Sequence, residues 1–168
     1  LLTNRVNVGA NEGGIGTVQV IGGGSRLTTD EVMSVGVDGR GILDIKNGGQ
    51  FVQTGQNPSI SIGGPQQNAF GTIKVDGEGS KVSTVGQMHV GAGGRGEIII
   101  SNGAEVLSGQ VLVGLGSRGE VTVSGNSVWK AKDFLIGSEW SGDGTLFVRD
   151  GGKVETNGDI GILVNPTG

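Results

Sequence analysis

Residues 88–106 read MHVGAGGRGEIIISNGAEV, and this stretch carries the signals that decide the fold. An apolar-x-apolar-Gly segment at 88–91 is followed by a glycine-rich loop and by a second segment that opens with Gly96. Ile98 and Ile100 then occupy alternate positions, which is the period of a strand with one buried face. A glycine turn and a third short apolar segment complete the stretch. The pattern predicts three short strands joined by turns.

The same order of segments returns along the whole chain. The glycines that end the first segment are separated by 27, 27, 28, 23 and 23 residues, and they are Gly9, Gly36, Gly63, Gly91, Gly114 and Gly137. The glycines that open the second segment are Gly16, Gly41, Gly71, Gly96, Gly119 and Gly144. The apolar residues of the third segment are Leu27, Phe51, Val82, Val106, Trp129 and Val154. Self-similarity at a fixed period is the signature of a repeat architecture.

These repeats predict an all-β fold, a right-handed parallel β-helix of about six to seven three-stranded coils with 23–28 residues each. The hand follows from the general preference of parallel crossovers. We expect residues 1–168 to form a single β-helix segment, with coils starting near residues 6, 33, 60, 88, 111, 134 and 160. Both chain ends cut into a coil, so we expect a fragment of a longer array.

Composition excludes several classes of protein. The chain has 168 residues, of which 37 are glycine, and its formal net charge is −4 with 17% charged residues. Without a basic stripe we expect no nucleic-acid or anionic-lipid partner, and without a long apolar run we expect membrane contact only through an anchor outside the fragment. The absence of cysteine excludes disulfides and thiolate metal sites, and it is compatible with an exported chain that stays unfolded in transit.

The outward positions do not form a catalytic or metal-binding pattern. His89 lies between Ser61 and Leu112 in its column and has no histidine or carboxylate beside it, whereas a metal site needs several donors. The two stacked carboxylates, Glu97 and Glu120, face arginines. We therefore predict no enzyme activity and no catalytic, cofactor-binding or metal-binding residues. The cross-strand neighbours Asp44 and Lys74, and Lys46 and Asp76, are expected to be solvated ion pairs.

Four residues are candidates for contact with a ligand or partner: Trp140, Phe70, Arg95 and Arg118. The two aromatic residues fall in irregular loops, at 64–70 and 138–143, where a ring can stack on a sugar or anchor a protein, unless it folds back onto the rod. Arg40, Arg95 and Arg118 each precede a second-segment glycine. They either pair diagonally with Glu97 and Glu120 or form a basic edge for an anionic glycan or phosphate.

Three strings carry a family resemblance, and they lie at residues 16–27, 100–106 and 121–129. They read Gly-Thr-Val-x-Val followed by Gly-Gly-Ser-x-Leu, then Ile-Ser-Asn-Gly-Ala-Glu-Val, then Val-Thr-Val-Ser-Gly-Asn-Ser-Val-Trp. They resemble the passenger repeat of autotransporters (type V secretion), which some PEP-CTERM surface proteins share. The resemblance covers about residues 6–164 and implies no catalytic residues.

The resemblance implies a β-helical stalk on the bacterial cell surface, exported through the outer membrane. Such a passenger acts as an adhesin or aggregation factor, with a host or bacterial surface protein or glycan as partner, or by self-association. The alternative is a carbohydrate-active β-helix, similar to polysaccharide lyases or hydrolases, whose catalytic coils lie outside this fragment.

Overall fold

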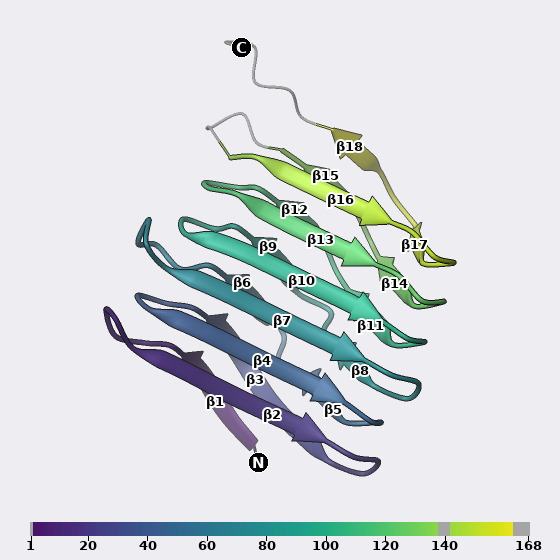
Figure 1. Cartoon of the computed structure of the whole chain (residues 1–168), viewed down its shortest axis with the longest axis horizontal. Coiled ribbons are helices and arrows are strands. Elements are labelled where there is room, and N and C mark those ends of the chain that lie inside the picture. The colour runs from purple at the N-terminus through teal and green to yellow at the C-terminus, as the bar shows by residue number, and fades with distance from the viewer. Residues whose placement is uncertain (1, 138–141, 163–168) are drawn as a thin grey trace.

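The computed structural model of the chain describes residues 2–137 and 142–162. Within those residues the secondary structure consists of strands and turns, without a helix, and every strand pair is parallel. The strands stack as a β-solenoid of about six turns, as Figure 1 shows. This confirms the all-β, parallel β-helix expected from the repeats.

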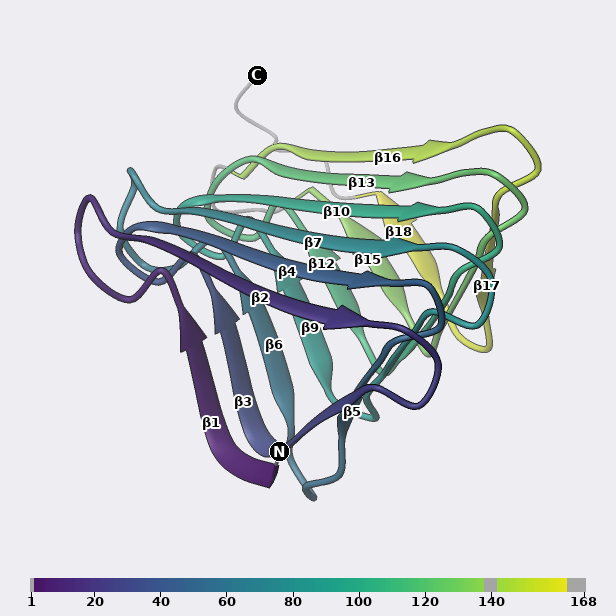
Figure 2. The same ribbon diagram turned by 60° about the horizontal axis from the view of Figure 1, so that its bottom comes forward.

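Each coil contributes one strand to each of three faces, which Figure 2 shows enclosing a narrow interior. The first face consists of β1 (Leu2–Val8), the second half of β3 (Arg26–Val35), β6 (Ser59–Ile62), β9 (Gln87–Val90), β12 (Val111–Val113), β15 (Phe134–Ile136) and β18 (Ile160–Ile162). The second face is a six-stranded sheet of β2 (Ile15–Ile21), β4 (Arg40–Lys46), β7 (Phe70–Asp76), β10 (Arg95–Ser101), β13 (Gly119–Val123) and β16 (Gly144–Val148). The third face consists of the first half of β3, β5 (Gln50–Gln53), β8 (Lys81–Ser83), β11 (Glu105–Ser108), β14 (Val128–Ala131) and β17 (Lys153–Thr156).

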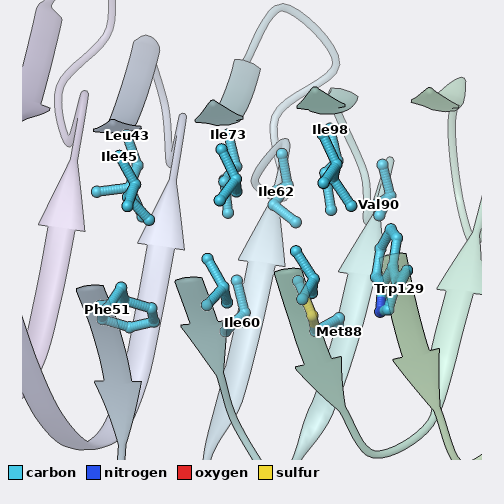
Figure 3. Packing of buried hydrophobic residues seen from close by; sticks show 14 of the residues in the cluster. Leu43, Ile45, Phe51, Ile60, Ile62, Ile73, Met88, Val90, Ile98 and Trp129 are labelled. Atoms are coloured by element: carbon cyan, nitrogen blue, oxygen red, sulfur yellow. The ribbon is translucent and has the colours of Figure 1, made fainter. Parts of the chain in front are cut away.

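Inward side chains lie above one another in apolar columns, in the register that the repeats predict. On the first face the buried column is Met33, Ile60, Met88, Val111 and Phe134. On the second face it is Leu43, Ile73, Ile98 and Val121. On the third face it is Leu27, Phe51, Val82, Val106 and Trp129. Figure 3 shows these columns meeting in the interior, where they exclude water from branched and aromatic side chains.

Trp129 shows how tightly the interior is filled. Its ring meets Phe134 edge-on with 5.2 Å between centroids. Its indole N–H donates a hydrogen bond of 2.9 Å to the Ser108 hydroxyl one coil away. The largest side chain of the core is therefore fully buried with its polar atom satisfied, which is the condition for burying a tryptophan.

Glycine shapes the corner between the first and second faces. Gly91 ends its strand with a φ of 78°, a left-handed conformation that favours glycine. Gly96 opens the next strand so close to it that an added Cβ would collide with the Gly91 nitrogen and the Ile62 carbonyl. The same two-glycine contact recurs in the other coils, between Gly36 and Gly41, Gly63 and Gly71, Gly114 and Gly119, and Gly137 and Gly144. The repeated glycines are therefore a steric requirement of this corner.

The turns between the second and third faces interlock from coil to coil. Asn47 and Asn102 adopt left-handed conformations, with φ of 55° and 58°. The Ser80 hydroxyl accepts a hydrogen bond of 3.1 Å from the Gly48 amide of the coil below. The Ser127 hydroxyl likewise accepts one of 3.2 Å from the Ala104 amide. Serine turns thus satisfy backbone groups of the asparagine-glycine turns beside them.

The stack ends differently from its middle. Val148, 47% exposed, and Ile162, 74% exposed, occupy inward positions in the last two coils that the structure describes. The equivalent positions in the middle coils, such as Ile100 and Val90, are fully buried. Among the described residues no further coil covers these side chains, and no helix there is long and apolar enough to cross a membrane.

Inward and outward positions should respond differently to substitution. Ile98 is 1% exposed, so Ile98→Asp would bury an unpaired charge and should destabilise the fold by about 4 kcal/mol or more. Lys74→Ala removes an exposed side chain from the neighbouring strand and should change stability by less than about 0.5 kcal/mol. Thermal unfolding followed by circular dichroism measures both variants. Equal melting of the two would contradict the assignment of inward and outward faces.

Candidate functional site

Six residues of the second face stand just before the first glycine of each strand, with Ile15 and Asp143 at the two ends of the column. The four between them form an outer edge. They are Arg40, Phe70, Arg95 and Arg118, which we call the arginine edge. Backbone hydrogen bonds hold the column in register: the Phe70 amide donates to the Gly39 carbonyl and the Arg95 amide to the Ala69 carbonyl, at 3.0 and 2.9 Å. Because neighbouring parallel strands lie about 4.8 Å apart, the four side chains are evenly spaced along the solenoid.

Phe70 lies in a strand, which corrects its predicted place on a protruding loop. It is the first residue of β7 and is partly buried, with Arg40 on the strand to one side and Arg95 on the strand to the other. The guanidinium carbons of these arginines lie 5.1 and 5.2 Å from the ring centroid. Both contacts are cation–π contacts, one from each neighbouring strand. The ring therefore holds the two guanidinium groups in place and is not free to stack on a ligand.

The two predicted arginines of the edge have different partners. Arg118 pairs with Glu120 of its own strand at 2.9 Å, an exposed contact that contributes little to stability. Arg95 instead contacts Phe70, while Glu97 accepts a long hydrogen bond of 3.5 Å from the Thr72 hydroxyl. Of the two alternatives that the sequence left open, the described residues therefore do not form the diagonal Arg–Glu pairing.

Arg40 also belongs to this site; it is not among the four predicted contact residues, but the repeat places it in the possible basic edge. Its signal was its position before Gly41, the slot that Arg95 and Arg118 occupy in later coils. Arg40 and Arg95 are both exposed. Within residues 2–137 and 142–162, neither forms an ion pair with a carboxylate. Two unneutralised guanidinium groups therefore flank one ring.

A polar hollow of about 520 Å³ lies at the same corner of the solenoid. It is lined by Asn11, Glu12, Asp38, Gln66, Gln67 and Asn68. Asp38 and Asn68 lie two residues before Arg40 and Phe70 along the chain, so the hollow adjoins the arginine edge. Its amides and carboxylates can exchange hydrogen bonds with a ligand rich in hydroxyl groups.

A second groove, of about 500 Å³, follows the corner between the third and first faces. Asn57, Gln87, Gln110 and Asp133 are among its lining residues. The Gln87 amide donates a hydrogen bond of 3.0 Å to the Gln110 side-chain oxygen, so these two amides already satisfy one another in part. Lys132 also lines this groove; it is exposed and, in the described part of the chain, forms no ion pair. It is a single cation, whereas Arg40 and Arg95 belong to a row along the solenoid.

The ion pairs predicted elsewhere on the second face are replaced by others. Asp44 and Lys74, and Lys46 and Asp76, are register neighbours as expected. Lys46 nevertheless pairs with Asp44 on its own strand at 3.0 Å. Asp76 accepts hydrogen bonds from Ser101 and Asn102 of the next coil, at 2.6 and 2.7 Å.

His89 lies on the outer side of β9, partly buried between Ser61 and Leu112. Burial lowers the pKa of its imidazole below the ordinary value of 6.5. The described part of the chain holds no group of three or more histidine, cysteine, aspartate or glutamate side chains that could bind a metal ion. Trp140, the fourth predicted contact residue, lies outside the described residues.

No family model, curated protein or solved structure matches this chain. The arginine edge is therefore interpreted from its own chemistry. Cations held in a fixed row across the starts of neighbouring strands can bind anionic groups.

The shifted pKa of His89 predicts how stability depends on pH. Because the folded pKa is lowered, the unfolded chain binds the proton more readily, so stability is fully present above about pH 6.5 and decreases as the pH falls below it. His89→Gln removes the titrating group. The free energy of unfolding of this variant, measured by denaturant titration, should increase relative to that of the natural chain as the pH is lowered from 8 to 5. A difference between the two proteins that is the same at both pH values would contradict this interpretation.

Proposed function

We propose that this chain is a structural and binding segment of a bacterial cell-surface protein of the autotransporter passenger type. Its role is that of an adhesin or adhesin stalk in cell adhesion or aggregation. The observation that supports this proposal best is the separation of the two kinds of column. Apolar columns fill the interior of the middle coils, whereas Arg40 and Arg95 are exposed on an outer edge.

The solenoid is suited to extend away from a cell surface as a rod. Each coil hydrogen-bonds to its neighbours along the axis, so exposed strand edges occur only at the ends of the stack. Six coils at a strand spacing of about 4.8 Å make a rod of roughly 29 Å, and added coils would lengthen it in proportion. A chain without cysteine can also cross a secretion pore unfolded and gain its stability from coil stacking alone.

The outer surface favours binding over hydrolysis. A glycan-cleaving site needs two carboxylates placed on either side of the bond to be broken. The stacked carboxylates of the second face are Glu97 and Glu120, and Glu120 is engaged by Arg118. The arginine edge, in contrast, presents exposed cations that can contact an acidic ligand.

The proposed location and role can be tested in cells that carry the gene. Antibodies raised against residues 1–168 should label intact cells, while antibodies against a cytoplasmic protein should label them only after permeabilisation. Deletion of the gene should reduce adhesion to surfaces or the settling of cell aggregates. Labelling that requires permeabilisation, or adhesion and settling that are unchanged in the deletion strain, would contradict the proposal.

A further inference from the structure

We propose that the arginine edge binds the acidic groups of an anionic polysaccharide that lies along the axis of the solenoid. Arg40 and Arg95 would hold carboxylate or sulfate groups, and the polar groups beside them would hold sugar hydroxyls. The choice of polymer rests on the proposed surface role, because acidic polysaccharides are available outside a cell. The binding itself depends only on this chain.

The guanidinium groups of Arg40 and Arg95 are available to bind an anion. Arg40 and Arg95 are exposed and, among the described residues, have no carboxylate partner. Their contacts with the Phe70 ring, at 5.1 and 5.2 Å, restrict side chains that would otherwise be mobile. Preorganised cations lose less conformational entropy when they bind an anion. The planar guanidinium can also bind a carboxylate or sulfate through two parallel hydrogen bonds.

The spacing of the arginines along the solenoid favours a polymer over a small anion. Arg40 and Arg95 lie two coils apart in one column, or about 10 Å at the usual strand spacing. Arg118 follows on the next coil, where its exposed pair with Glu120 can be exchanged at little cost. A small anion would reach one guanidinium, whereas a polymer along the axis reaches several at once. Such repeated contacts raise affinity without any deep pocket.

The carboxylates beside the arginine edge favour a polysaccharide over a nucleic acid. The column next to the arginine edge contains Thr72, Glu97 and Glu120. The adjoining hollow adds Glu12 and Asp38. Duplex DNA carries one negative charge per about 1.7 Å of its axis, so these carboxylates and the net charge of −4 disfavour it more than a polysaccharide, whose acidic groups are separated by neutral hydroxyls. The partly exposed carboxylates of Glu97 and Glu120 and the polar side chains of the hollow are instead suited to accept hydrogen bonds from sugar hydroxyls.

The test uses the purified chain and immobilised polymers, with affinity measured by biolayer interferometry at low salt. Polygalacturonate presents carboxylates, dextran sulfate presents sulfates, neutral dextran presents neither, and duplex DNA presents phosphates. The double variant Arg40→Gln/Arg95→Gln removes both unpaired cations of the edge. Arg26→Gln/Arg149→Gln makes the same charge change at exposed arginines elsewhere, and Phe70→Leu removes the ring while keeping both charges.

We expect the natural chain to bind polygalacturonate or dextran sulfate, more weakly as salt is added, and the tighter polymer identifies the acidic group. Arg40→Gln/Arg95→Gln should reduce affinity at least about tenfold, and Phe70→Leu about threefold. The control pair Arg26→Gln/Arg149→Gln should bind like the natural chain. Circular dichroism should show all three variants folded, since the substituted side chains are outside the core.

Several results would overturn the proposal: no binding to either acidic polymer, equal binding to neutral dextran, tighter binding to DNA, or an equal loss in the control pair. The two experiments test the proposed surface role and the proposed binding site independently. Binding by a chain that antibodies find only inside cells would remove the surface role and leave the site. Labelled intact cells with a chain that binds no acidic polymer would remove the site and leave the surface role.

Discussion

The close approach of two glycine columns, at the corner between the first and second faces, fixes how each coil lies on the next. A side chain at Gly96 would displace the Gly91 nitrogen and the Ile62 carbonyl, and neither can move without breaking the backbone hydrogen bonds between coils. Because every coil turns this corner in the same way, the strands of the second face pair without offset. The apolar columns, the interlocked turns and the outer edge all depend on that register.

The same register connects the fold to the proposed function. Stacking without offset places inward residues above one another, and it does the same for outward residues. A residue type that recurs before the second-strand glycine therefore becomes a row, as Arg40, Arg95 and Arg118 do. Phe70 interrupts that row and becomes the surface on which two guanidinium groups lie. The interior can thus stay apolar while the edge varies.

Inward residues were predictable from the sequence, and outward contacts were not. Burial of Ile98 or Trp129 involves a large free energy, so the pattern of apolar residues identified their columns correctly. Exposed ion pairs differ by less than about 1 kcal/mol, and Lys46 has partners on its own strand and on the next, so local geometry decided the pairing. Phe70 was misplaced because the long segment before it resembles a loop that continues through it. The ring contact between Phe70 and Arg40 joins residues 30 positions apart, and only their shared place before Gly71 and Gly41 in the repeat puts them side by side.

The fold depends on the register between coils, and because the chain contains no cysteine, introduced cysteine pairs can measure that register directly. Lys74 and Ile99 are outward-facing register partners, and neighbouring parallel strands place their Cα atoms about 4.8 Å apart, within the range that a disulfide spans. Under mild oxidation, Lys74→Cys/Ile99→Cys should form an intramolecular disulfide in mass spectrometry. Asp44→Cys/Ile99→Cys, two coils apart, and Lys74→Cys/Glu97→Cys, out of register, should keep free thiols. A disulfide in either of these two variants, with free thiols in the first, would contradict the stacking described here.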